Sequence, residues 1–184
     1  MPDVKKEVKG LLQNPDCANF TEKVINRVAK DTGVAFTSDY IPDLFASVEI
    51  DFTDQGSIAG KHIAAKIYPR DAKTGTYKLG LSPKNGAGFT ESGIRNIKYD
   101  YVESYLHELI HAAGANRRYN DQEVAQAIVN LVKDGDLTLS KSALGQFNSI
   151  KPGDVAAYSA WFDTALQHYC PGLGGERTRG DFPK

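Results

Sequence analysis

The sequence has no long apolar run, and no stretch of it approaches the ~20 residues that a membrane-spanning helix needs. It also has no excess of charge of one sign, because 22 Lys and Arg stand against 23 Asp and Glu. Composition therefore gives no indication of a surface that binds nucleic acid or an anionic membrane. We expect neither nucleic acid nor a membrane among the partners of the chain. The first six residues lack the apolar core of a signal peptide.

Cysteine is scarce, with Cys17 and Cys170 near opposite ends of the chain. Their separation excludes a metal-binding knuckle of the C-x-x-C kind. Two interpretations stay open: a disulfide that joins the first and last predicted helices, or two buried free thiols. A disulfide is typical of secreted and periplasmic proteins. We therefore favour a secreted or periplasmic location and keep a cytoplasmic one as the alternative.

Length and hydrophobic pattern predict a single α+β domain over residues 1–184, with 172–184 as a flexible tail. A chain of 184 residues can bury a sizeable core. Asn14 and Pro15 are typical of a helix start, and Gly33 of a helix end. Alternating apolar residues predict three strands, over 48–52, 63–67 and 77–81. Apolar residues at spacings of three and four predict a last helix over 154–169. The last two strands are expected to form a hairpin.

The most specific motif is an H-E-x-x-H string that runs from His107 to His111. Its context predicts a helix, because residues 97–113 contain no proline or glycine and their apolar side chains recur at spacings of three and four. Gly114 is expected to end this helix. On a helix the two histidines lie on one face, one turn apart, so that both can bind one metal ion. Glu108 then lies beside any water that the metal holds.

A catalytic zinc site needs a third protein ligand and one open position. A third histidine six residues after His111 is absent, because that position is Arg117. The next acidic residues are Asp121 and Glu123, at the start of another helical pattern. Asn120 and Glu123 have the spacing of a capping box, which gives Glu123 a structural role. We therefore favour Asp121 as the third ligand and keep Glu123 as the alternative.

The segment from His107 to Glu123 resembles the active-site region of zincin metallopeptidases. Two histidines followed by Asp121 are similar to the aspzincin branch, and the phrase His-Glu-Leu-Ile-His-Ala-Ala-Gly also looks like uncharacterised bacterial zincin-like proteins. The resemblance implies a small twisted, mostly antiparallel sheet packed on helices that include the H-E-x-x-H helix. It also implies an edge strand that pairs with extended substrate, and we assign this role to residues 77–81.

The resemblance and the residues together lead us to expect a zinc metallopeptidase. His107, His111 and Asp121 are expected to bind Zn²⁺, and Glu108 is expected to act as general base toward the metal-activated water. The expected partner is a peptide or protein substrate, and the expected state is a monomer. The alternative is a zinc-binding pseudoenzyme or interaction domain without catalysis.

Peptide hydrolysis builds negative charge on the scissile carbonyl oxygen, and a phenol or guanidinium often helps a metal to stabilise it. The nearest candidates by sequence lie in the loop between the ligands: Arg117, Arg118 and Tyr119. Among the three we expect Tyr119 to be the second catalytic residue.

Overall fold

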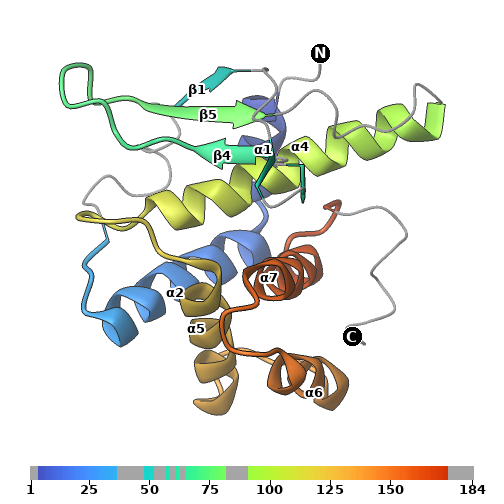
Figure 1. Cartoon of the computed structure of the whole chain (residues 1–184). Helices are drawn as coiled ribbons and strands as arrows, with labels where there is room; N and C mark the ends of the chain where they lie inside the picture. Colours follow the sequence, from blue (N-terminus) through green and yellow to red (C-terminus); the bar gives the residue numbers. More distant parts are fainter. Residues whose placement is uncertain are drawn as a thin grey trace.

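The computed structural model describes residues 4–36, 48–51, 57–58, 61–62, 65–81 and 91–173. This part of the chain is an α+β structure, as the sequence predicts, and most of it is helical (Figure 1). The helices are α1 (Val4–Leu12), α2 (Pro15–Thr32), α4 (Glu91–Ala112), α5 (Asp121–Lys133), α6 (Lys141–Ser149) and α7 (Val155–Tyr169). The strands are β1 (Val48–Asp51), β2 (Ser57–Ile58), β3 (Lys61–His62), β4 (Ala65–Ile67) and β5 (Tyr77–Leu81). Of the predicted tail, residues 174–184 lie outside the described residues.

The main sheet has three strands in the order β1-β5-β4. β4 and β5 form the predicted hairpin and are antiparallel, with Ile67 opposite Leu79. β1 runs parallel to β5, so the sheet is mixed, while the short pair β2 and β3 is antiparallel. The assignment of residues 77–81 to the sheet edge is wrong, because β5 has a strand on each side. Among the described strands, the edge that packs against α4 is β4.

The predicted signals at both ends of α2 are confirmed. The side chain of Asn14 accepts hydrogen bonds from the amides of Asp16, at 2.9 Å, and Cys17, at 3.4 Å. These contacts satisfy two of the amides that a helix N-terminus leaves without partners. Gly33 ends the helix with φ of 71°, a left-handed conformation that glycine adopts without steric cost.

The motif helix α4 lies between the small sheet and the helices α2 and α7 (Figure 1). It begins at Glu91, six residues before the predicted start at residue 97. The predicted apolar stripe is confirmed, because all of its members are buried: Val102, Leu106, Leu109, Ile110 and Ala113. The side chains of His107 and His111 leave the helix away from this stripe, and they too are buried. From residue 102 to 112 the helix is thus covered by its neighbours, and this packing holds its polar side chains in place.

Cys17 and Cys170 form a disulfide, which decides between the two interpretations of the sequence. The bond joins the first turn of α2 to the residue that caps the C-terminus of α7. Both cysteines are fully buried. Beside them the rings of Phe20 and Tyr169 stack, with their centroids 4.6 Å apart. The first and last predicted helices are therefore joined covalently and by packing.

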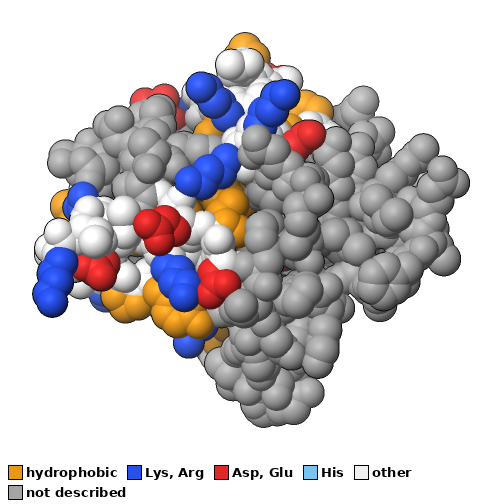
Figure 2. Space-filling model, turned by 90° about the horizontal axis from the view of Figure 1, so that it is seen from above, with side chains coloured by type: hydrophobic (Ala, Val, Ile, Leu, Met, Phe, Trp, Pro, Cys, Tyr) orange, Lys and Arg blue, Asp and Glu red, His pale blue; other side chains and the backbone are white. Residues whose placement is uncertain are grey.

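Charges of both signs are interspersed on the face of the molecule that carries the sheet (Figure 2). Lys78 of β5, for example, forms an ion pair of 2.9 Å with Asp51 of β1. In the part of the chain that the structure describes, no helix has the length and apolar character needed to cross a membrane.

Replacement of both cysteines, Cys17→Ala with Cys170→Ala, is expected to lower the free energy of unfolding by about 2–5 kcal/mol. The physical reason is that the bond closes a loop with a sequence separation of 153 residues and so restricts the unfolded chain. Urea unfolding under non-reducing conditions measures the loss. Fully reduced wild-type protein is the matched control and should resemble the double variant. An unchanged unfolding midpoint would contradict the stabilising role.

Candidate metal centre

A tight turn after α4 leads the chain back onto the motif helix. A side chain at Gly114 would overlap the carbonyl oxygen of Arg117, so only glycine fits this close approach of two backbone segments. The predicted helix end near Gly114 is confirmed, since α4 ends at Ala112. Glycine is needed at position 114 because the backbone of Arg117 lies close to it. The amide of Tyr119 then donates a hydrogen bond of 3.0 Å to the carbonyl oxygen of His111. This contact places the first residue of α5, Asp121, beside the two histidines.

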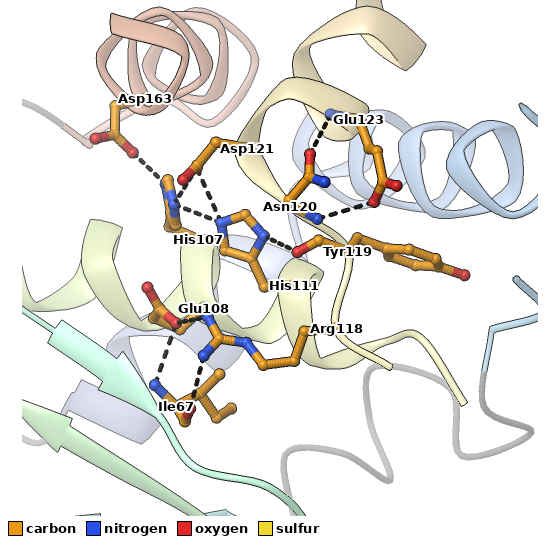
Figure 3. Close-up of polar contacts among 10 residues, drawn as sticks. All are labelled: Ile67, His107, Glu108, His111, Arg118, Tyr119, Asn120, Asp121, Glu123 and Asp163. Atoms are coloured by element: carbon orange, nitrogen blue, oxygen red, sulfur yellow. Dashed lines mark hydrogen bonds and ion pairs between the residues drawn. The ribbon is translucent and has the colours of Figure 1, made fainter. Parts of the chain in front are cut away.

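Three potential metal ligands converge at this point: His107, His111 and Asp121 (Figure 3). The two Nε2 atoms lie 2.8 Å apart, and Oδ1 of Asp121 lies 3.1 Å from Nε2 of His107 and 3.0 Å from Nε2 of His111. Ligands at ~2.0–2.1 Å from a tetrahedral zinc ion would be separated by roughly 3.3 Å, close to the sides of this triangle. The predicted trio is therefore brought together in a geometry that suits one metal ion.

Glu123 has the structural role that the sequence predicts, in the N-terminal capping box of α5. Asn120 accepts from the amide of Glu123 at 2.8 Å, and the Glu123 carboxylate accepts from the amide of Asn120 at 3.0 Å. The same carboxylate binds the guanidinium of Arg117 through two contacts of 2.6 and 2.9 Å. The cap and Arg117 thus engage both carboxylate oxygens of Glu123, and the acid that faces the histidines is Asp121.

The Nδ1 atom of each histidine has a partner that orients the ring. Nδ1 of His111 lies 2.7 Å from the main-chain carbonyl oxygen of Tyr119, and Nδ1 of His107 lies 2.6 Å from Oδ1 of Asp163. Oxygen acceptors at Nδ1 favour the tautomer whose Nε2 carries the lone pair, which is the form that binds a metal. Both imidazoles are therefore oriented with Nε2 toward Asp121.

Asp163 is the residue of the site that sequence reasoning missed. It comes from α7, 56 residues from His107, and no motif connects the two. One signal was present: Asp163 is the only acidic residue within α7, on a helix that otherwise packs aromatic and aliphatic side chains into the core. A lone carboxylate on such a helix favours a specific polar partner.

The convergence of the donors requires a positive charge among them. The carbonyl oxygen of Tyr119 can only accept, so His111 donates to it through Nδ1, and Nε2 of His111 faces His107 and Asp121. The carboxylates of Asp163 and Asp121, 2.6 and 3.1 Å from the ring nitrogens of His107, favour that charge on His107. Burial by itself lowers the pKa of His107, but Asp163 and Asp121 outweigh it and raise this pKa well above its ordinary value. Burial by itself raises the pKa of Asp121. The two histidines outweigh burial and hold this pKa well below its ordinary value.

Glu108 lies on the sheet side of the histidines. Its Oε2 accepts a hydrogen bond of 3.2 Å from the amide of Ile67 and one of 3.3 Å from Nη2 of Arg118 (Figure 3). Arg118 also donates through Nη1 to the carbonyl oxygen of Ile67, at 2.9 Å. The Glu108 side chain is 11% exposed and that of Arg118 is 44% exposed. A carboxylate next to the ligand cluster is thus held by strand β4 and a loop arginine.

The expected catalytic role of Tyr119 is corrected by the direction of its side chain. The phenol points away from the histidines (Figure 3), and its hydroxyl donates a hydrogen bond of 2.7 Å to the carbonyl oxygen of Val34. Burial raises the pKa of this phenol to about 12. What Tyr119 contributes to the site is its main-chain carbonyl, which orients His111. Of the three loop residues considered, the one that contacts Glu108 is Arg118.

Comparisons with family models, curated proteins and solved structures find no match for this chain. The site is therefore interpreted from its own geometry: the buried His107 and His111 and the half-buried Asp121 are arranged so that they could hold a metal ion.

Asp121→Ala is expected to weaken the binding of added zinc by more than about 100-fold, because it would remove one of three candidate ligands. Loss of an outer partner of a ligand costs about 10- to 100-fold. Glu123→Ala is the matched control. It should keep the metal and lose about 1 kcal/mol of stability with the helix cap. Zinc content by elemental analysis and affinity by chelator competition give the comparison. Loss of zinc in the Glu123 variant alone would show that the third ligand is misassigned.

Asp163→Asn is expected to weaken zinc binding by about 10- to 100-fold, because the amide no longer supports the His107 imidazole with a negative charge. Asp154→Asn is a suitable control, since Asp154 caps the same helix at its exposed N-terminus and asparagine caps equally well. Chelator competition on both variants measures the difference. Equal affinities would exclude a role of Asp163 in the metal centre.

Proposed function

We propose that the chain is a zinc-dependent metallopeptidase that hydrolyses peptide bonds. The observation that carries the proposal is the convergence of His107, His111 and Asp121 beside the carboxylate of Glu108. Two imidazoles and one carboxylate form a three-ligand set that is typical of catalytic zinc and leaves a fourth position for water. The resemblance of the H-E-x-x-H segment to zincins supports the same reaction.

In this proposal each residue of the site has a separate task. Zinc held by the trio would lower the pKa of a bound water to about 7 and polarise the scissile carbonyl. Glu108 accepts the proton of the attacking water and donates it to the leaving amine nitrogen. Asp163 and the carbonyl of Tyr119 keep the Nε2 lone pairs of the two histidines available.

Two features favour Glu108 as the base. Glu108 lies between the two histidines on the same buried stretch of α4. The backbone there cannot shift without disturbing the core. It is also anchored through one oxygen only. Contacts to Ile67 and Arg118 involve Oε2, and among the described residues no hydrogen bond is made to Oε1. One carboxylate oxygen is therefore held and the other is left for proton transfer.

The buried disulfide extends the proposal to the location of the protein. Disulfides persist in oxidising compartments and are rare where thiols are kept reduced. We accordingly propose a secreted or periplasmic protein that acts on a peptide or protein substrate.

The second candidate is a zinc-binding interaction domain without catalysis. One observation favours it: the phenol of Tyr119, the expected stabiliser of the carbonyl oxygen, is bonded to Val34 instead. The presence of Glu108 at hydrogen-bonding distance from two donors argues for the peptidase, because a domain that only binds metal does not need a carboxylate held next to the ligands.

Glu108→Gln is expected to retain zinc and to lower peptide cleavage by at least about 100-fold, because an amide cannot accept the proton. Glu103→Gln is the matched control, since Glu103 lies five residues earlier on α4 and accepts a hydrogen bond of 2.7 Å from Gln167. Cleavage of a mixed peptide library, followed by mass spectrometry, measures both. Full activity of the Glu108 variant would refute the base assignment. A zinc-loaded wild-type protein that cleaves no peptide would favour the interaction domain.

A further inference from the structure

Glu108 is held by a closed set of three contacts on the side away from the metal ligands (Figure 3). The amide of Ile67 and Nη2 of Arg118 both donate to Oε2, and Nη1 of Arg118 donates to the carbonyl oxygen of Ile67. The three partners come from α4, β4 and the loop before α5. Each contact therefore restricts the other two.

The anchor of this arrangement is the backbone of Ile67. In an antiparallel pair, alternate residues direct their amide and carbonyl toward the neighbouring strand. Tyr68 does so, because its amide donates to the carbonyl oxygen of Lys78 at 2.8 Å. Ile67, one residue earlier, directs both groups away from β5, and its side chain is buried. Glu108 and Arg118 supply the partners that this strand edge needs.

The neighbouring arginine shows that the contact of Arg118 is specific. Arg117 belongs to the same loop and has a similar exposure, 46% against 44%. Its guanidinium binds Glu123 in the cap of α5 and donates a hydrogen bond of 3.1 Å to the main-chain carbonyl of Arg118, not to Glu108. Two adjacent cations of equal charge thus bind different carboxylates: Arg117 binds Glu123 at the helix cap, and Arg118 binds Glu108.

We propose that Arg118 is a positioning residue that clamps Glu108 against Ile67 and thereby directs Oε1 toward the metal centre. The planar guanidinium is suited to this because it donates to two acceptors at once in a fixed geometry. The clamp is a property of the metal-free protein, whereas its effect on catalysis rests on the proposed function. The two parts are tested by different measurements.

The clamp is tested by hydrogen exchange of the Ile67 amide, measured by NMR on the metal-free protein. Arg118→Ala is expected to speed exchange at Ile67 by about two- to tenfold, because Glu108 is no longer held as an acceptor. Arg117→Ala removes the same charge from the same loop and should leave this amide unchanged. Arg118→Lys provides a second variant if the alanine variant does not fold, and it should give an intermediate rate since an ammonium lacks the fork. Unchanged exchange in both Arg118 variants overturns the clamp.

The catalytic consequence is tested by steady-state kinetics of the zinc-loaded protein. Arg118→Ala is expected to lower kcat by about 10- to 100-fold, as for a misplaced catalytic group, with KM and zinc content unchanged. Arg118→Lys should recover part of kcat, and Arg117→Ala should resemble wild type. A higher KM with unchanged kcat overturns the positioning role and assigns Arg118 to substrate binding. Faster exchange at Ile67 in a protein whose wild type cleaves no peptide supports the clamp and overturns the peptidase.

Discussion

The mutual approach of three electron-pair donors in a buried place is the constraint on which the rest of this structure depends. Nε2 of His107, Nε2 of His111 and Oδ1 of Asp121 lie within 2.8–3.1 Å of one another. Such an arrangement is unfavourable unless a cation lies among the donors, because neutral imidazole nitrogens repel through their lone pairs and a buried carboxylate needs compensation. The fold must therefore hold these atoms together against that repulsion, and a proton or a metal ion must relieve it.

Separate elements supply the restraint. The close turn at Gly114 returns the chain to α4, so that the backbone of Tyr119 binds both the carbonyl and the imidazole of His111. The cap at Asn120 sets the first turn of α5 and with it the direction of Asp121. Helix α7 brings Asp163 to His107, and the buried disulfide ties the end of α7 to α2. The candidate metal centre is thus a product of three helices and one loop, although two of its three candidate ligands come from five consecutive residues.

Much of the local structure was predictable because it depends on neighbours in sequence. The Asn14 cap, the left-handed Gly33 and the apolar stripe of α4 follow from helix periodicity and backbone preferences, which act over a few residues. The capping box explained Glu123 and so pointed to Asp121. Strand order could not be predicted in the same way: alternation identifies a strand without saying which strands flank it, and so the sheet edge was assigned to β5 rather than β4. The direction of Tyr119 was missed because a distant acceptor, the carbonyl of Val34, determines it.

The sequence alone determined the candidate ligand set of this protein: an H-E-x-x-H segment on a helix, an acid after a short loop, and a cap that engages the competing acid. These are local properties, since a helix fixes the relation of residues one turn apart wherever it lies. Only the tertiary structure decided which residues support that chemistry. Asp163 reaches His107 across 56 residues, and Ile67 reaches Glu108 across 41. Such partners are set by how helices and strands pack, and packing is a property of the whole core that no single segment encodes.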